Sequence, residues 1–373
     1  MLLPNVWPGL NNESTGPIAQ SWKYESRMNG WNTPADYKSY VHPHWLSYEE
    51  PNPMLHHLLG VLYIFFMIAS CLGNGIVIYI FSTTKELKTP SNILILNLAI
   101  CDFIMMIKTP VFIVNSFNEG PVLGCSIYGL LGAYVGPCSA VTNAAIAYDR
   151  YRCISDPMGK RWSKSQASLI VLGCWVYASP VSLLPFTELV NRFVPEGYLT
   201  SCTFDYMADN LETKIFVFLL WIWCWIMPLG VIIFSYGKIT TQVMTHEARL
   251  KEQAKKMNVE TLRSGANKDV RNEIRVAKVG ISLTTLFLLS WTPYFMIAFI
   301  GCYGNRALLT PGLSMIPACT CKLAACVDPA INHPKYRLEL MKRLPWLCVH
   351  EKDECAKEES SNASVISEAE SRT

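Results

Sequence analysis

Lys322 is the residue whose position most directly suggests chemistry, because it lies near the middle of an apolar stretch, residues 311–331. A charge at the centre of a membrane-spanning helix costs roughly 2.5–3.5 kcal/mol on insertion scales. A lysine at mid-helix is also poorly placed to extend its amine to either membrane surface. The amine must therefore be paired, neutral or covalently used. A desolvated lysine amine is the usual partner of an aldehyde in a Schiff base, so covalent use of Lys322 is a candidate function.

The composition indicates which elements must position Lys322. Hydrophobic residues make up 51% of the 373 residues and charged residues only 16%, whereas a soluble domain carries about a quarter charged residues. Seven apolar blocks come near the length of about 20 residues that a bilayer demands. These blocks cover residues 56–82, 91–116, 122–148, 167–190, 213–237, 276–302 and 311–331. The sequence therefore predicts an all-α membrane protein, a bundle of seven transmembrane helices.

Basic residues gather in the loops after the first, third, fifth and seventh blocks, which all lie on one side of such a bundle. The positive-inside rule makes that side cytoplasmic and places the N-terminus outside. The first 20 residues show no cleavable signal peptide. We expect an extracellular tail over residues 1–55, the bundle over 56–331, an amphipathic helix on the membrane lipids over 332–346 and a disordered cytoplasmic tail over 347–373.

The expected outer side carries candidates for two modifications. Most of the 14 cysteines lie in apolar blocks, where a free cysteine behaves as a small hydrophobic residue. Cys125 and Cys202 lie instead on the outer side, where a cysteine pair would be oxidised, and Cys302 is a third candidate. Asn12, in an Asn-Glu-Ser triplet, is a candidate glycosylation site.

Polar residues and prolines interrupt the apolar blocks at five places. Asp149-Arg150-Tyr151 ends the third block, and Asn74, Asp102, Pro293 and Asp328-Pro329 lie inside four others. An ordinary charged helix end would explain the first alone, but intramembrane polar groups and prolines together indicate cavities or hinges. In this order and on these helices, they resemble the rhodopsin-like family of G-protein-coupled receptors over about residues 56–345.

Within that family, Lys322 marks an opsin. Further stretches resemble the arthropod visual opsins, and the likeness is closest to the insect ultraviolet-sensitive branch. These stretches are residues 89–93, 147–151, 192–202, 253–259 and 333–337. The resemblance implies that Lys322 holds retinal, in the 11-cis form or as a hydroxylated relative, as a Schiff base. It also implies that Trp291 packs against the chromophore ring, and that Tyr128 stands where vertebrate pigments carry a glutamate.

Two charged residues are expected to set the protonation of that Schiff base. Glu196 resembles the carboxylate counterion of invertebrate opsins, and a nearby carboxylate favours the protonated form; the alternative is a solvated loop acid. Lys108 lies toward the outer part of the second block. It either extends to the outer surface or faces the chromophore, where its charge disfavours protonation. An unprotonated retinal Schiff base absorbs in the ultraviolet, so Lys108 is the expected spectral tuning residue.

The resemblance also implies partners on the cytoplasmic side. We expect a Gq-type heterotrimeric G protein to contact Asp149-Arg150-Tyr151 and His333-Pro334-Lys335. A receptor kinase and arrestin are expected to act on the serines of the tail, Ser360, Ser361, Ser364, Ser367 and Ser371. The expected location is the plasma membrane, in particular a rhabdomeric photoreceptor membrane. We expect no metal site, no nucleic-acid partner and no enzymatic activity.

Two other functions remain open on the sequence. A few residues after Asp328-Pro329 are missing relative to the family pattern, including a tyrosine that takes part in the active state of relatives. The seventh helix should therefore end nearly a turn early, which weakens the case for signalling and leaves a photoisomerase-type opsin as the alternative. A transporter with an intramembrane lysine is the other rival, but the asymmetric loops and the lack of inverted repeats argue against it.

Overall fold

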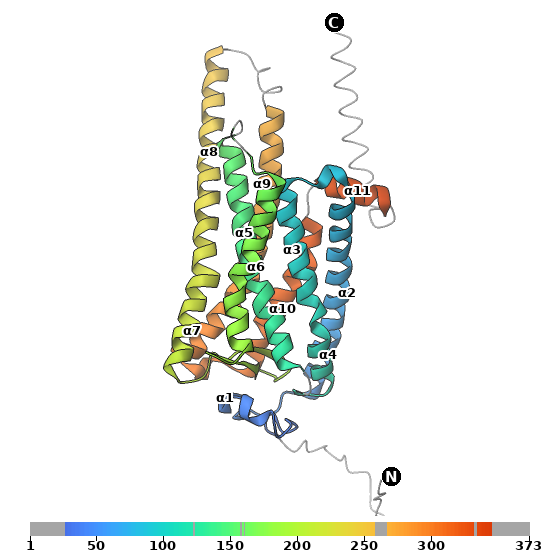
Figure 1. The fold of residues 1–373 in the computed structure, drawn as a ribbon, viewed down its shortest axis with the longest axis vertical. Helices are drawn as coiled ribbons and strands as arrows, with labels where there is room; N and C mark the ends of the chain where they lie inside the picture. Colours follow the sequence, from blue (N-terminus) through green and yellow to red (C-terminus); the bar gives the residue numbers. More distant parts are fainter. Residues whose placement is uncertain are drawn as a thin grey trace, which may run out of the picture.

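A computed structural model describes residues 27–121, 124–156, 159, 161–257, 267–331 and 334–344. Within these residues the chain is a bundle of long helices that run roughly parallel to the long axis of the molecule (Figure 1). Five of the spanning segments are α2 (Pro53–Thr83), α3 with α4 (Pro90–Ile107 and Thr109–Phe117), α5 (Cys125–Ser155), α6 (Lys164–Phe186) and α9 (Asn267–Tyr303). The remaining one, which is the fifth along the chain, consists of α7 (Leu211–Trp221), the π-helix η3 (Ile222–Ile226) and α8 (Met227–Met257).

The seventh segment is α10 (Pro311–Val327), which continues as the 3-10 helix η6 (Asp328–Ile331). The other six segments are each long and apolar enough to cross a membrane, and α10 is shorter, with 17 residues. The prediction of an all-α seven-helix membrane protein is confirmed. The α-helical part of the seventh segment ends at Val327, and the 3-10 part reaches the predicted limit of the block at Ile331. The fourth segment ends at Phe186, four residues before the predicted limit of 190.

Short local signals start the helices. Asn52, Thr89 and Thr310 each accept a hydrogen bond from a backbone N–H of the first turn, and each is followed by a proline. A side-chain acceptor at the N-cap satisfies one of the backbone donors that a helix start leaves open. Proline suits the next position because it has no N–H to satisfy there. The starts of α2, α3 and α10 are therefore encoded by neighbouring residues.

The second segment breaks between α3 and α4 at Lys108, next to Thr109-Pro110. Pro110 has no N–H to donate to the carbonyl of Met106, four residues before it. The hydroxyl of Thr109 donates to that carbonyl instead, at 2.6 Å. The break is thus stabilised locally, and it fixes the direction in which Lys108 leaves the helix.

A two-stranded antiparallel hairpin closes one end of the bundle, which we call the hairpin end. Strand β1 (Phe193–Glu196) pairs with β2 (Ser201–Phe204), Glu196 opposite Ser201, and all eight residues are buried. The segment that includes α1 (Pro43–Leu46) covers it, and the amide of Asn29 donates to the carbonyl of Gly197 at 3.0 Å. This hairpin is the one sheet in the described residues and was not predicted from the sequence.

A disulfide joins Cys125 at the start of α5 to Cys202 in β2, with the Cα atoms 5.4 Å apart. The expectation of an oxidised pair is confirmed for these two residues. Cys302, the third candidate, is a free and buried thiol. The disulfide therefore ties the hairpin to the central helix of the bundle.

The helix α11 (Pro334–Arg343) lies crosswise at the other end of the bundle (Figure 1). Tyr336 anchors it, because this ring is buried and stacks on Phe81 of α2 with the centroids 5.7 Å apart. The backbone thus forms a short helix where an amphipathic one was expected. The predicted sites at Asn12, His333 and the five tail serines, Ser360, Ser361, Ser364, Ser367 and Ser371, lie outside the described residues.

We expect the double replacement of Cys125 and Cys202 by serine to lower the free energy of unfolding of the apo-protein by roughly 2–4 kcal/mol. The disulfide closes a segment with a sequence separation of 77 residues, and the loss of a cross-link restores conformational entropy to the unfolded chain. Thermal unfolding in detergent measures the change. Cys302→Ser is the control for loss of a free thiol, and an unfolding midpoint equal to that of this control would contradict a structural role.

Candidate functional site

A cavity lies between the helices and beside the hairpin, with about 730 Å³ of space that is partly open to solvent. Its walls come from α3, α5, α9 and α10 and from both strands, and most of the lining side chains are apolar or aromatic. Small-molecule sites have volumes of roughly 300–1,000 Å³ and combine apolar walls with a few polar groups. The lining therefore has the character of a site for an apolar small molecule.

Three glycines of α5 make room for side chains that line this cavity. Gly129, Gly132 and Gly136 line it, at a spacing that places them on one face of the helix. A Cβ atom on them would overlap the ring of Phe193, the amine of Lys108 and the ring of Trp291, respectively. The glycine spacing in the sequence indicates a helix face without side chains, a signal that was not among the predictions.

Lys322 projects from α10 into the cavity and is only 5% exposed. Its Nζ donates a hydrogen bond to Sγ of Cys321 at 3.3 Å and lies 5.9 Å from the ring centroid of Tyr128. Among the described residues, no carboxylate oxygen forms an ion pair with this amine. Of the three states inferred from the sequence, ion pairing therefore has no support in the described structure, and a neutral or covalently used amine remains.

Lys108 also faces the cavity, so it does not extend to the outer surface. Its Nζ donates to the backbone carbonyl of Tyr128 at 3.2 Å and lies 4.1 Å from the centroid of the Tyr128 ring. A cation over an aromatic face is attracted by the quadrupole of the ring. Because both lysine amines are near the same ring, they lie within about 10 Å of each other.

Glu196 is 4% exposed, so it is a buried acid and not a solvated loop acid. The hydroxyls of Ser201 and Tyr206 donate to its two carboxylate oxygens at 3.2 Å and 3.0 Å. Burial raises the pKa of Glu196 to about 7, although the two hydrogen bonds and the charges of Lys322 and Lys108 oppose this rise. Both oxygens are thus held by neutral donors of the hairpin region, and the described residues contain no ion pair between Glu196 and either lysine.

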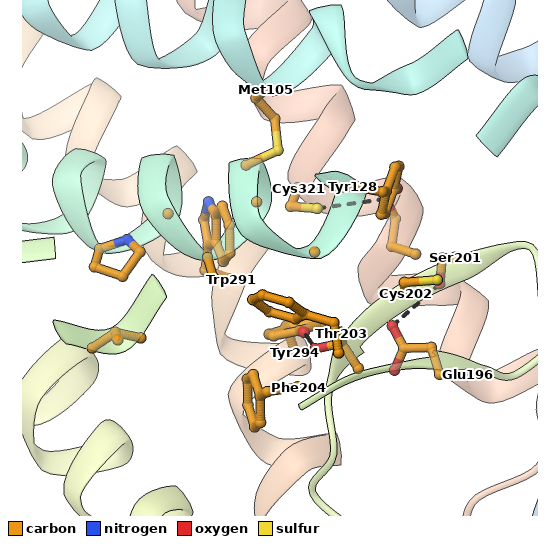
Figure 2. Close-up of a pocket in the computed structure, with 18 of the residues that line it drawn as sticks. Met105, Tyr128, Glu196, Ser201, Cys202, Thr203, Phe204, Trp291, Tyr294 and Cys321 are labelled. Carbon is orange, nitrogen blue, oxygen red and sulfur yellow. Dashed lines mark hydrogen bonds between the residues drawn. The ribbon is translucent and has the colours of Figure 1, made fainter. Parts of the chain in front are cut away.

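The aromatic end of the cavity is separate from the acidic end. Figure 2 shows Trp291, Tyr294 and Phe204 gathered at one end, and Glu196 with Ser201 below Tyr128 at the other. The ring of Trp291 lies 6.1 Å from that of Tyr294, edge to face. The predicted chromophore residues Lys322, Lys108, Glu196, Trp291 and Tyr128 therefore line one cavity.

A second, smaller cavity of about 290 Å³ lies at the α11 end, and Asp149 and Arg150 line it. The hydroxyl of Ser91 donates to Asp149 at 2.7 Å, and the guanidinium of Arg150 contacts both residues. Tyr151 packs edge-on against Phe234 of α8, with the centroids 5.5 Å apart. The structure thus places Asp149 and Arg150 at one small cavity, whereas Tyr151 packs on α8 and does not line it. Pro334 and Lys335 begin α11.

Three residues of the larger cavity's polar network were missed by the sequence analysis. Cys321 contacts the amine of Lys322, and Ser201 and Tyr206 hold Glu196. Cys321 could have been suspected as the neighbour of Lys322. The contact of Tyr206 with Glu196 depends on the path of the chain after β2, for which the sequence contains no periodic signal.

The fold and the cavity define the class of the protein, a seven-helix membrane receptor with an internal small-molecule site. Comparisons identify the family. The model of the "7 transmembrane receptor (rhodopsin family)" matches residues 73–331. The ultraviolet-sensitive opsin of Apis mellifera is 53% identical over 333 residues, which cover 87% of this chain and 90% of that one. Opsin Rh3 of Drosophila melanogaster is 49% identical, with coverages of 91% and 90%.

The solved structures agree with the sequence relatives. The crystal structure of squid rhodopsin superimposes with a TM-score of 0.76 at 32% identity, over 82% of this chain and 90% of that one. The chain belongs to the rhodopsin family of seven-transmembrane receptors and, within it, to the opsins. It is accordingly a multi-pass membrane protein and a photoreceptor rather than an enzyme. The family further implies a retinal chromophore and a heterotrimeric G protein as partner.

We expect Glu196 to make the stability of the apo-protein depend on pH. Its pKa is raised from 4.5 to about 7 in the folded state. Between these values the folded protein keeps a proton that the unfolded chain releases, so the free energy of unfolding falls as the pH rises. Over this pH range the free energy of unfolding of the wild type should fall by at most about 3 kcal/mol, and Glu196→Gln should not show this fall. Thermal midpoints measured between about pH 5 and about pH 8 test this, and equal slopes for both proteins would refute it.

Proposed function

We propose that this protein is a light-activated visual receptor, ultraviolet-sensitive, that carries retinal on Lys322 as a Schiff base. The observation that carries the proposal is the Lys322 amine, which is buried, faces a mostly apolar cavity and has no carboxylate partner among the described residues. Retinal supplies light absorption and photoisomerisation when it is bound. The apolar and aromatic side chains that form most of the cavity wall fit an elongated apolar group.

The charges around Lys322 support ultraviolet absorption. An unprotonated Schiff base requires that the positive charge on this nitrogen be disfavoured. Lys108 supplies a second cation within about 10 Å, and two unit charges at that separation repel by roughly 1.7 kcal/mol at an effective dielectric constant of about 20. Glu196 is the candidate counterion, but its oxygens already accept hydrogen bonds from Ser201 and Tyr206. The balance therefore favours the unprotonated form.

The signalling part of the proposal rests on the α11 end of the bundle. Trp291 contacts α5 at Gly136 and is followed by Pro293, so a displaced ring would act on α9 at a proline. The proposed partner that binds near Arg150 is a Gq-type G protein. By resemblance, the same proposal includes a receptor kinase and arrestin as partners. It also includes an extracellular N-terminus and a location in the rhabdomeric plasma membrane. Light-dependent release of inositol phosphates in transfected cells measures the Gq coupling.

The end of the seventh helix gives a reason to measure coupling directly. The 3-10 segment Asp328–Ile331 contains no tyrosine, and its Pro329 packs against α2 at Gly73. A 3-10 helix rises about 2.0 Å per residue instead of 1.5 Å, so four residues in this form span more distance than in an α-helix. The chain reaches α11 with few residues. Light-dependent pigment conversion without a G-protein response would favour the photoisomerase-type alternative.

Lys322→Ala should abolish pigment formation with 11-cis retinal, because it removes the amine that the proposal assigns to the Schiff base. Lys108→Ala is the matched control, since it removes the other lysine of the cavity and should still yield pigment. Difference spectra before and after bleaching report the pigment, and surface labelling reports the amount of folded protein. A pigment of normal yield in Lys322→Ala would disprove the attachment site.

Lys108→Asn should shift the absorption of the pigment from the ultraviolet to the visible. Removal of a repulsion of roughly 1.7 kcal/mol changes the protonation equilibrium of the Schiff base by about tenfold or more. The absorption spectrum of the purified dark pigment measures the shift. Lys88→Asn, at an exposed lysine, is the control and should leave the spectrum unchanged. An unmoved ultraviolet band in Lys108→Asn would remove Lys108 from the tuning mechanism.

A further inference from the structure

The immediate hydrogen-bond partner of Lys322 is a thiol. Cys321 is 5% exposed and lines the same cavity. Its Sγ accepts the hydrogen bond from Nζ of Lys322 at 3.3 Å and donates to the carbonyl of Ala318 at 3.4 Å. Glu196 has two hydroxyl donors of its own, and the centroid of the Tyr128 ring lies 5.9 Å from the amine. The sulfur is thus the group in direct contact with the nitrogen that the proposed function uses.

A thiol can adapt to either protonation state of that nitrogen. A charged Schiff-base nitrogen has one N–H and can only donate, whereas an uncharged one has a lone pair and can only accept. The thiol sulfur is a weak acceptor and the S–H group a weak donor. Rotation about the Cβ–Sγ bond of Cys321 moves its hydrogen from the carbonyl of Ala318 toward the nitrogen of Lys322. The same side chain therefore satisfies both states in a dry site, where an unpaired polar group is costly.

We propose that Cys321 is a positioning residue that holds the Schiff-base nitrogen of Lys322 through its thiol and helps to set the balance between the ultraviolet and visible forms. The inference rests on the proposed attachment of retinal to Lys322. Because sulfur accepts hydrogen bonds weakly, Cys321 stabilises a positive charge less than a hydroxyl would at the same place. The residue thus acts in the same direction as Lys108, by contact instead of by charge.

The chain offers a matched control thiol on the same helix. Cys326 of α10 also donates to a backbone carbonyl, that of Phe66, at 3.4 Å. It does not line the cavity. A change at Cys326 therefore alters a thiol of α10 that donates to a carbonyl, here one of α2, without changing the contact of Lys322.

Infrared spectroscopy of the S–H stretching band tests the proposal on the full-length protein. The band of Cys321 should shift between apo-opsin and pigment. The shifting component should vanish in Cys321→Ser and Cys321→Ala and persist in Cys326→Ser. On acidification, Cys321→Ser should reach its visible form at a pH about one unit higher than the wild type, a tenfold change, because a hydroxyl oxygen accepts from a charged donor better than sulfur does. Cys326→Ser should titrate like the wild type.

Two outcomes separate this inference from the proposed function. Borohydride reduction followed by peptide mass spectrometry locates the retinal adduct in the wild type. An adduct absent from Lys322 refutes the proposed function. If the adduct is on Lys322, two results would overturn the role of Cys321 alone. One is an S–H band that does not move on pigment formation, and the other is a Cys321→Ser titration midpoint equal to that of the wild type. If Cys321→Ser gives no pigment, the band shift in the wild type and its loss in Cys321→Ala decide the question.

Discussion

The burial of the Lys322 amine in an apolar cavity, without an ion pair in the described residues, is the constraint on which the rest of the site depends. A buried ionisable group is costly unless it is paired or neutral, so every neighbour of this nitrogen affects its charge. The bundle supplies a buried, mostly apolar site for it, and the hairpin covers that site at one end. Chemistry at Lys322 thus follows from exclusion of water, which requires both the helices and the hairpin.

Three ionisable side chains share this site, and their positions come from unrelated local structures. Lys108 is directed inward by the break at Pro110, where the Thr109 hydroxyl replaces a missing backbone donor. Glu196 is brought in by the hairpin, which the Cys125–Cys202 disulfide ties to α5. The carboxylate is held by Ser201 and Tyr206 instead of by a lysine. The cavity therefore contains two lysine amines and a nearby acid whose oxygens accept hydrogen bonds from Ser201 and Tyr206.

The parts of this arrangement that are local in sequence could be predicted, and the parts that depend on chain path could not. Lys322 and the apolar blocks are visible because membrane length and charge cost are properties of single segments. The inward direction of Lys108 was left open, since extension to the surface is equally compatible with its place in the block. The hairpin and the contact of Tyr206 with Glu196 depend on pairing between residues of a loop. Loop pairing has no periodic signature, so the hairpin was missed.

One helix, α5, connects the cavity to the other end of the bundle. It carries the disulfide at Cys125, the small face at Gly132 and Gly136, and Arg150 near its end. At about 1.5 Å per residue, the distance along the helix from Gly136 to Arg150 is roughly 21 Å. Trp291 touches α5 at Gly136, where Pro137 also removes a backbone hydrogen bond from the helix. The contact between the aromatic end of the cavity and α5 therefore falls at a weakened point of the helix that bears Arg150. The same helix thus lines both the larger cavity and the small cavity around Asp149 and Arg150.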